Sequence, residues 1–363
     1  MEHSQGMDLL KCRHIAVPIL CGTRHPVFRK IGNCLSLGRV AFAATQEIRR
    51  QRVEAVIIII QGRYYIAAAL ASWVTATPLI AIVHDDVFSS NVGHWKFTAT
   101  MLRRWTKRIL QLAAHIYAVS PEMRRLVFAE CGQEAEVQLP STAMPVREAA
   151  GQFDFIDSGC PAILFAGTVG YTVRDSVDLL ANLIATGKLK EYGLPKPILY
   201  LCTSMTDAEI QKQGWNQPGI VVKGWLSQPE LARQLSRADI LFLPYSFSTI
   251  SQQAVETAFP SKAADYLAAG KPIVVLGPRN SSLVRYASEE GFAEIVTEFS
   301  EAALARAIQK VAFSASYSAK LAARALEVFS VNHDIRCQRK NFYITLDRIS
   351  RTRSKSLPSL SGA

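Results

Sequence analysis

The feature that most constrains the fold of this chain is the alternation of short, unbroken apolar runs with stretches of helical periodicity. Such runs are typical of strands buried on both faces, as in a parallel sheet covered by helices. The sequence therefore predicts an α/β protein of doubly wound, Rossmann-like architecture. The apolar runs are Ile15–Leu20, Ala55–Ile60, Leu79–Val83, His115–Val119, Ala162–Ala166, Ile198–Cys202, Ile220–Val222, Ile240–Leu243 and Ile273–Leu276. The helical stretches are 38–52, 97–113, 121–131, 175–190, 228–237, 261–269 and 301–325.

The length of 363 residues favours two domains over one. Proline and glycine cluster between Pro140 and Pro161, where the apolar pattern lapses. We expect two Rossmann-like domains that face each other across a cleft. Their expected bounds are 1–150 for a first domain abbreviated at its start, 151–333 for a second domain, and 334–363 for a closing helix followed by a disordered basic tail from 351.

Charge and cysteine content narrow the class of protein. The formal net charge of +11 implies attraction to anions without saying which. The positive charges are spread along the chain, and no helix-turn-helix or RNA-binding signature accompanies them, so we expect no nucleic-acid partner. The 7 cysteines are scattered without a C-x-x-C pair, which favours free thiols in a reducing compartment and no zinc site.

One uncharged run, 66–83, approaches the length of a membrane-spanning helix. Pro78 splits it and Ser72, Thr75 and Thr77 dilute it, so we read a buried helix over 64–76 and a strand over 79–83. Residues 1–14 lack the apolar core of a signal peptide. The expected location is the cytoplasm, with the inner membrane face as an alternative for peripheral contact.

Polar, aromatic and glycine residues follow five of the predicted strands. Ligands of open parallel sheets bind beyond the carboxyl ends of the strands, so these residues are candidates for one shared site. They are His84, Asp85 and Asp86 after 79–83; Ser120 after 115–119; Gly167, Thr168 and Gly170 after 162–166; Gly224 and Trp225 after 220–222; and Tyr245 after 240–243.

The most informative segment is FPSKAADYLAAGKPIVV, residues 259–275. We expect Ser261 to cap a short helix, whose free N–H groups and positive dipole end favour anions. Lys262 adds a full positive charge at that end, where a lysine without a ligand would be poorly placed. Asp265 lies on the same helical face. A cation beside a carboxylate suits phosphates next to a ribose, as in a nucleotide sugar.

Three stretches of the second half resemble the GT-B glycosyltransferases, most closely the retaining family-4 type. FAGTVGYTVRDSVDLL is similar to the family's strand, glycine loop and helix; IVVKGWLSQPELARQLSRADILFLPY and FPSKAADYLAAGKPIVVLGP match its later signatures. The segments YAVSPEMRRL and VHDD echo weaker signatures of the first half. The resemblance spans roughly 40–330 and is strongest over 160–280. The family's first strand–glycine loop–helix unit is not recognisable before Arg39.

The resemblance implies a role for each candidate residue. The catalytic set would be His84, reaching the sugar from the first domain, with Arg174 and Lys262 neutralising the leaving diphosphate. The donor-binding set would be Gly167, Thr168, Gly170, Gly224, Trp225, Tyr245, Ser261 and Asp265. Many members have arginine at the position of Thr168, and Arg174 is the candidate to replace it. Several of these residues also have an ordinary structural interpretation. His84 could be a core histidine, Trp225 and Tyr245 could be packing aromatics, and Lys262 and Asp265 could form a surface ion pair.

The implied activity is transfer of a sugar from a nucleotide-diphosphate sugar to an acceptor hydroxyl with retention, in polysaccharide, lipid-linked glycan or glycoconjugate synthesis. No D-x-D pair occurs, so we expect no metal and no cofactor beyond the donor itself. Two alternatives stay open. The chain could be a nucleotide-sugar epimerase on the same scaffold, which would release no nucleoside diphosphate, or a non-catalytic nucleotide-sugar-binding protein.

The segment 101–113, MLRRWTKRILQLA, predicts a basic amphipathic helix. Its basic face would carry Arg103, Arg104, Lys107 and Arg108, and its apolar face Met101, Leu102, Trp105, Ile109 and Leu112. Such a helix suits peripheral contact with an anionic membrane. It also suits an ordinary domain helix whose apolar face packs on the sheet, which is the interpretation we favour slightly.

Overall fold

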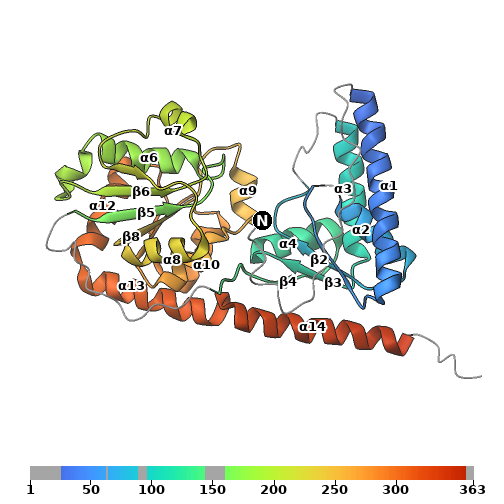
Figure 1. The fold of residues 1–363 in the computed structure, drawn as a ribbon. Helices are drawn as coiled ribbons and strands as arrows, with labels where there is room; N and C mark the ends of the chain where they lie inside the picture. The colour runs from blue at the N-terminus through green and yellow to red at the C-terminus, as the bar shows by residue number, and fades with distance from the viewer. Residues whose placement is uncertain (1–25, 63, 89–95, 144–159, 357–363) are drawn as a thin grey trace, which may run out of the picture.

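The computed structural model describes residues 26–62, 64–88, 96–143 and 160–356, without the side chains of 26–34, 96–99 and 352–356. It contains two parallel sheets, each wrapped by helices (Figure 1), which confirms the predicted α/β class with two Rossmann-like domains. The predicted strand 15–20 lies outside the described residues.

The first domain has a four-stranded parallel sheet of order β1-β2-β3-β4 among the described residues. Its core strand β2 is almost wholly buried because it pairs on both sides, with Ile80 opposite both Ile57 and His115. The strands are β1 (Val56–Ile59), β2 (Leu79–Val83), β3 (His115–Ala118) and β4 (Glu136–Val137), and the helices are α1 (Pro26–Gln51), α2 (Tyr65–Val74), α3 (Lys96–Gln111) and α4 (Pro121–Cys131).

The second domain has a six-stranded parallel sheet of order β10-β9-β8-β5-β6-β7. The order reverses at β5, so the loops after β5 and β8 diverge to opposite faces and leave room for a ligand between them. The strands are β5 (Ala162–Ala166), β6 (Ile198–Cys202), β7 (Ile220–Val222), β8 (Ile240–Pro244), β9 (Ile273–Leu276) and β10 (Ala293–Val296). The helices are α6 (Arg174–Ala185), η1 (Lys188–Tyr192), α7 (Asp207–Gln213), α8 (Gln228–Arg237), α9 (Gln252–Thr257), α10 (Lys262–Ala269), α11 (Ser282–Glu290), α12 (Glu301–Phe313), α13 (Ala315–Val328) and η2 (Phe329–His333).

The last helix, α14 (Ile335–Ser356), leaves the second domain and packs under the first (Figure 1). Phe342 lies against Tyr117 of β3, with ring centroids 5.7 Å apart. Ile349 completes a small buried cluster with Ile80 and Tyr117. The chain therefore crosses between the domains twice, and the second crossing is fixed by apolar packing.

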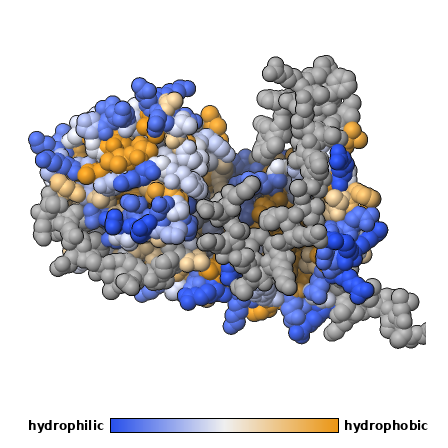
Figure 2. Space-filling view, viewed as in Figure 1, coloured by the Kyte–Doolittle hydropathy of each residue, from blue (hydrophilic) through white to orange (hydrophobic). Residues whose placement is uncertain are grey.

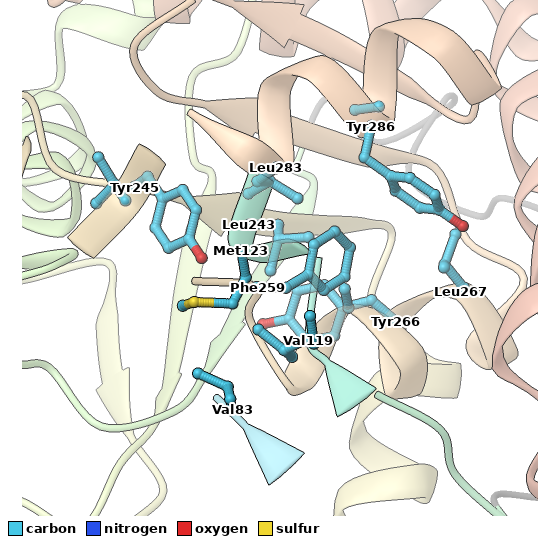
Figure 3. Close-up of a cluster of buried hydrophobic side chains, with 14 of the residues drawn as sticks. Val83, Val119, Met123, Leu243, Tyr245, Phe259, Tyr266, Leu267, Leu283 and Tyr286 are labelled. Carbon is cyan, nitrogen blue, oxygen red and sulfur yellow. The ribbon is translucent and has the colours of Figure 1, made fainter. Parts of the chain in front are cut away.

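A single hydrophobic cluster extends through both domains beneath their facing loops. Figure 3 shows Val83, Val119 and Met123 of the first domain beside buried residues of the second, including Leu243 and Phe259. The carboxyl ends of the two sheets are thus held together by a common core. This core fixes the region in which a shared site can form.

Several element boundaries differ from the predictions. Helix α1 begins at Pro26 rather than 38, and the stretch 301–325 divides at Ser314 into α12 and α13. Residues 351–356, predicted as disordered tail, continue helix α14, while 357–363 lie outside the described residues. The apolar and helical patterns in the sequence did not predict the strands β4 and β10 or the helices α7, α9 and α11. These elements are short, or no change in residue composition separates them from the preceding strand.

Candidate functional site

The loops that follow β2 and β3 in the first domain adjoin the loops that follow β8 in the second. The Ser120 hydroxyl, which also caps α4, donates a hydrogen bond of 2.5 Å to the Thr257 carbonyl. The Asp85 carboxylate lies close enough to Tyr245 to help burial raise the pKa of its phenol. Figure 2 shows the surface hollowed between the two domains. The carboxyl ends of both sheets therefore meet, as predicted for a shared site.

Helix α10 brings Lys262 and Asp265 together as predicted. The Lys262 Nζ lies 3.3 Å from Asp265 Oδ2, and only 5% of Asp265 is exposed, while Lys262 is partly exposed. Ser261 does not cap the helix: it has helical backbone angles and makes no capping hydrogen bond. The predicted capping role is wrong because the first turn already begins at Pro260, whose carbonyl accepts from the Ala263 N–H at 3.0 Å.

Gln228, which was not identified from the sequence, contacts the same carboxylate as Lys262. Its side-chain amide donates to Asp265 Oδ1 at 3.2 Å, so both oxygens of the buried carboxylate have a donor. Gln228 is the first residue of α8, whose start is fixed by a capping box between Ser227 and Glu230. That S-x-x-E pattern is visible in the sequence and could have placed Gln228 at a helix start, although not beside Asp265.

The glycine loop after β5 combines a strained turn with open space. Gly167 has φ +154°, a conformation that side chains rarely adopt, and its N–H donates to the Cys202 carbonyl at 3.0 Å. Gly170 has no such backbone requirement, and a Cβ built on it would meet no atom within 4 Å. Thr168 is exposed between them. The protein's own packing therefore does not account for the glycine at position 170.

Arg174 begins α6 and braces this loop. One Nη2–H group donates to the Val169 carbonyl at 3.0 Å. The other nitrogen, Nη1, is buried without a hydrogen-bond partner among the described residues. Arg174 thus has an unpaired donor that is buried rather than open to a ligand, and its observed contact stabilises the loop itself, so its diphosphate role stays a prediction.

The three remaining second-domain candidates fall into two environments. Gly224 (φ +68°) and Trp225 follow β7, and Trp225 is 67% exposed, so its indole is available to a ligand. Tyr245, in contrast, is buried, and its hydroxyl donates to the Ala258 carbonyl at 3.1 Å. Tyr245 therefore supports the loop after β8 from the core and presents little surface.

His84 is the candidate from the first domain. It follows β2 and its side chain is exposed, yet the surrounding protein desolvates it enough to lower its pKa, against the opposing effect of Asp85. The imidazole is therefore mostly neutral at pH 7 and can accept a hydrogen bond. Two residues on, the Asp86 carboxylate accepts from the Phe88 N–H at 2.9 Å and turns the chain.

The described residues contain no cluster of three or more His, Cys, Asp or Glu able to hold a metal ion. Within the same ranges, every helix is too short or too polar to cross a lipid bilayer.

Comparison with family models matches both halves of the chain. Residues 10–139 match the family described as Glycosyltransferase Family 4, and residues 160–312 match Glycosyl transferases group 1. The first match begins well before Arg39, where the sequence motifs were not recognisable. No curated protein sequence matches the chain.

Solved structures share the fold at low sequence identity. The Anabaena protein HepE in complex with UDP and glucose is 14% identical, with a TM-score of 0.62 over 90% of this chain and 84% of that one. Sucrose-phosphate synthase from Thermosynechococcus elongatus is 14% identical, with a TM-score of 0.66 over 93% and 82%. An α,α-trehalose 6-phosphate synthase from Burkholderia multivorans is 12% identical, with a TM-score of 0.65 over 94% and 79%.

Proposed function

Because the chain belongs to the glycosyltransferases of the GT-B fold, we propose that it transfers a sugar from a nucleotide-diphosphate sugar to an acceptor hydroxyl with retention. The transfer would serve polysaccharide, lipid-linked glycan or glycoconjugate synthesis. The observation that carries the proposal is the buried Asp265 carboxylate paired with Lys262 at the start of α10. The HepE complex makes UDP-glucose the first donor to test.

The charges at the start of α10 favour a nucleotide. Lys262 stands at the positive end of the helix dipole, where a lysine is disfavoured unless negative charge surrounds it. Asp265 supplies one negative charge, and a diphosphate would supply more. The carboxylate itself accepts hydrogen bonds, as the two hydroxyls of a ribose would require. Lys262 would hold the diphosphate and Asp265 the ribose.

The glycine loop supplies room for the phosphates. A ligand backbone could approach Gly170 closely because no protein atom fills the space beside it. Gly167 and Thr168 would add polar groups of the same loop, and the unpaired Nη1 of Arg174 would join them once a shift of its side chain uncovers it. Gly224 and the exposed Trp225 would flank the base. The diphosphate would therefore lie between the glycine loop and α10.

The transfer follows from the chemistry of the leaving group. The bond between the anomeric carbon and the diphosphate oxygen breaks as the bond to the acceptor oxygen forms. Lys262 and Arg174 would stabilise the developing negative charge, the largest contribution in reactions of this kind, without need of a metal. The departing phosphate oxygen can take the acceptor proton. His84, neutral at pH 7, would position the sugar through a hydrogen bond.

A thermal-shift screen tests the donor site. The protein is heated with UDP-, GDP-, TDP- and CMP-sugars; a ligand at a hundred times its dissociation constant adds about 2.7 kcal/mol of stability. Gly170→Ala should keep the melting temperature and lose the shift, whereas Gly38→Ala, an equally unhindered glycine inside helix α1, should keep the shift and raise the melting temperature slightly, because alanine stabilises a helix relative to glycine. No shift of the parent protein with any sugar nucleotide would contradict the proposal.

A product assay then separates the possible activities. The transferase should release free nucleoside diphosphate only when an acceptor or water receives the sugar. Conversion of the sugar nucleotide without such release would identify an epimerase, and binding without turnover in the presence of a broad acceptor panel would identify a binding protein. Either outcome would overturn the proposed transfer.

Peripheral membrane contact through α3 belongs to the same proposal, with a corrected surface. Arg103 and Lys107 each pair with Glu130 of α4 at 2.7 Å, and Trp105 stacks on Trp73. Met101 and Leu112, predicted on the buried face, are 52% and 45% exposed. The solvent-facing stripe is therefore Met101, Arg104, Arg108 and Leu112, a mixture of apolar and basic side chains that suits an anionic membrane surface.

Vesicle flotation tests this stripe. The parent protein should float with vesicles that contain phosphatidylglycerol and not with neutral phosphatidylcholine vesicles. Arg104→Glu combined with Arg108→Glu should abolish flotation, because each basic residue near the surface contributes about 1 kcal/mol. The matched control, Lys212→Glu with Lys320→Glu, makes the same charge change on the second domain. Equal loss in both variants would show a nonspecific charge effect and contradict the stripe.

A further inference from the structure

The two segments that cross between the domains meet beside the candidate donor site. Thr142 of the first crossing forms a parallel bridge with Asp334 of the second. The Thr142 N–H donates to the His333 carbonyl at 3.0 Å, and the Ile335 N–H donates to the Thr142 carbonyl at 3.3 Å. The His333 ring adds a 2.6 Å hydrogen bond to the Pro140 carbonyl. The backbone of Thr142 therefore holds the two crossing segments together, and we call this contact the domain crossover.

The side chain of Gln228 joins this crossover to the buried carboxylate of α10. Its amide nitrogen lies 3.2 Å from Asp265 Oδ1 and 3.5 Å from Thr142 Oγ1. An amide nitrogen carries two hydrogens, one for each contact. The reverse orientation would place the amide oxygen against the carboxylate, so the negative charge of Asp265 selects the observed orientation.

We propose that Gln228 is a positioning residue that orients the Asp265 carboxylate for the ribose and ties that orientation to the domain crossover at Thr142. The inference rests on the proposed function. With Gln228 on Oδ1 and Lys262 on Oδ2, the plane of the carboxylate is fixed. Each oxygen keeps a second lone pair for a ribose hydroxyl. A rotation of one domain against the other would move Thr142 and loosen the contact to Gln228.

The fold does not depend on the Gln228 side chain. Gln228 is exposed, and α8 is anchored by the buried Leu231 and Leu235. The start of the helix is held by Ser227, whose N–H and hydroxyl donate to Glu230 at 2.9 and 2.6 Å. Removing the amide should therefore leave α8 in place and change only the support of Asp265.

Calorimetric titration with UDP, GDP, TDP and CMP tests the role. For the nucleotide that binds the parent best, Gln228→Ala should weaken affinity roughly ten-fold, the loss of one hydrogen bond to a charged group. Thr142→Val should weaken it only about two-fold, because 3.5 Å is the limit of a hydrogen bond. The double variant should match Gln228→Ala, since Thr142 acts through Gln228. Gln234→Ala, on the same helix, should bind as the parent does.

Steady-state kinetics separate positioning from a general structural effect. The ribose contact is the same in the ground state and the transition state, so Gln228→Ala should raise the donor KM roughly ten-fold and leave kcat unchanged. A fall in kcat with unchanged KM would overturn the positioning role.

The outcomes also separate this inference from the function on which it rests. A parent protein that binds none of the four nucleotides would overturn the proposed function and this inference with it. Binding by the parent with equal affinity in Gln228→Ala and Gln234→Ala would overturn the inference alone. Additive losses in the double variant would show that the crossover is not coupled to the carboxylate.

Discussion

The two sides of the interdomain cleft differ in how far the protein itself fixes their polar groups. In the second domain, Asp265 is buried and held on both oxygens by Lys262 and Gln228. In the first domain, His84 and Asp85 are exposed at the end of β2. One side is therefore preorganised by the protein itself, whereas the polar groups of the other side are free to adjust to what they contact.

The largest effect should come from the preorganised side. Lys262→Ala removes the cation that would stabilise the leaving diphosphate, so kcat should fall roughly 1,000-fold. Nucleotide affinity, measured by calorimetry, should fall as well. Lys320→Ala removes an exposed lysine elsewhere and should change neither. Parental activity of the Lys262→Ala variant would show that the groups fixed at α10 do not contribute to transfer, and would contradict the proposed difference between the two sides.

The crossover that joins the two sides should make stability depend on pH through His333. This histidine is 0% exposed, and burial lowers its pKa from 6.5 to about 4. Below pH 6.5, His333 takes up a proton in the unfolded chain but stays neutral in the folded chain. Its contribution to the free energy of unfolding is therefore fully present above pH 6.5 and is lost as the pH falls towards about 4. The loss should approach about 3 kcal/mol.

Urea unfolding from about pH 7 to about pH 4 measures this dependence. His333→Gln cannot titrate, so its stability should fall less steeply than that of the parent over the same range. Carboxylates titrate in both proteins and cancel in the difference. The groups around the ring are Tyr286, at 2.9 Å from Nε2, and the Pro140 carbonyl, with Glu290 and Arg324 next to Tyr286. Parallel curves would show that His333 does not carry the dependence.

The opposite side should respond in a different parameter. His84→Ala should lower kcat roughly 100-fold, because losing the hydrogen bond that would position the sugar misplaces the reacting atoms. The dissociation constant for UDP should stay within about two-fold, because UDP lacks the sugar that His84 would contact. Asp207→Ala, an exposed residue of the second domain, serves as a neutral control. A loss of UDP affinity would place His84 on the nucleotide instead.

The direct contact between the domains should contribute less. Ser120→Ala removes both the cap of α4 and the hydrogen bond to the Thr257 carbonyl, so unfolding free energy should fall by about 2 kcal/mol. The ion pair between the exposed Arg285 and Glu122, at 3.6 Å, should contribute at most about 0.5 kcal/mol, measured with Arg285→Ala because Glu122 also pairs with Arg125 of its own helix. If Arg285→Ala cost more than Ser120→Ala, charge pairing rather than the shared core would join the domains.

Local signals explain what the sequence could predict. Strands such as Leu79–Val83 and Ile220–Val222 have the predicted bounds because runs of branched apolar residues mark them sharply. Lys262 and Asp265 are three residues apart on one helix, so spacing alone placed them on one face.

The predictions that were missed or wrong concern contacts and boundaries that a local sequence pattern does not report. Gln228 meets Asp265 37 residues away and Thr142 86 residues away, and no local pattern reports either contact. Ser261 looked like a cap because serine prefers that position, yet Pro260 already begins the turn. Residues 351–356 are polar and basic like many tails, but helix α14 continues through them.

The return of α14 to the first domain has a consequence for biosynthesis. Ile80 and Tyr117 are translated early, yet the side chain that covers them, Ile349, is translated more than two hundred residues later. On the ribosome, the first sheet must wait with one apolar face uncovered while the second domain is made. The nascent chain thus exposes this apolar face until α14 has been made, and truncation just before α14 should destabilise the first domain although all of that domain's own residues are present.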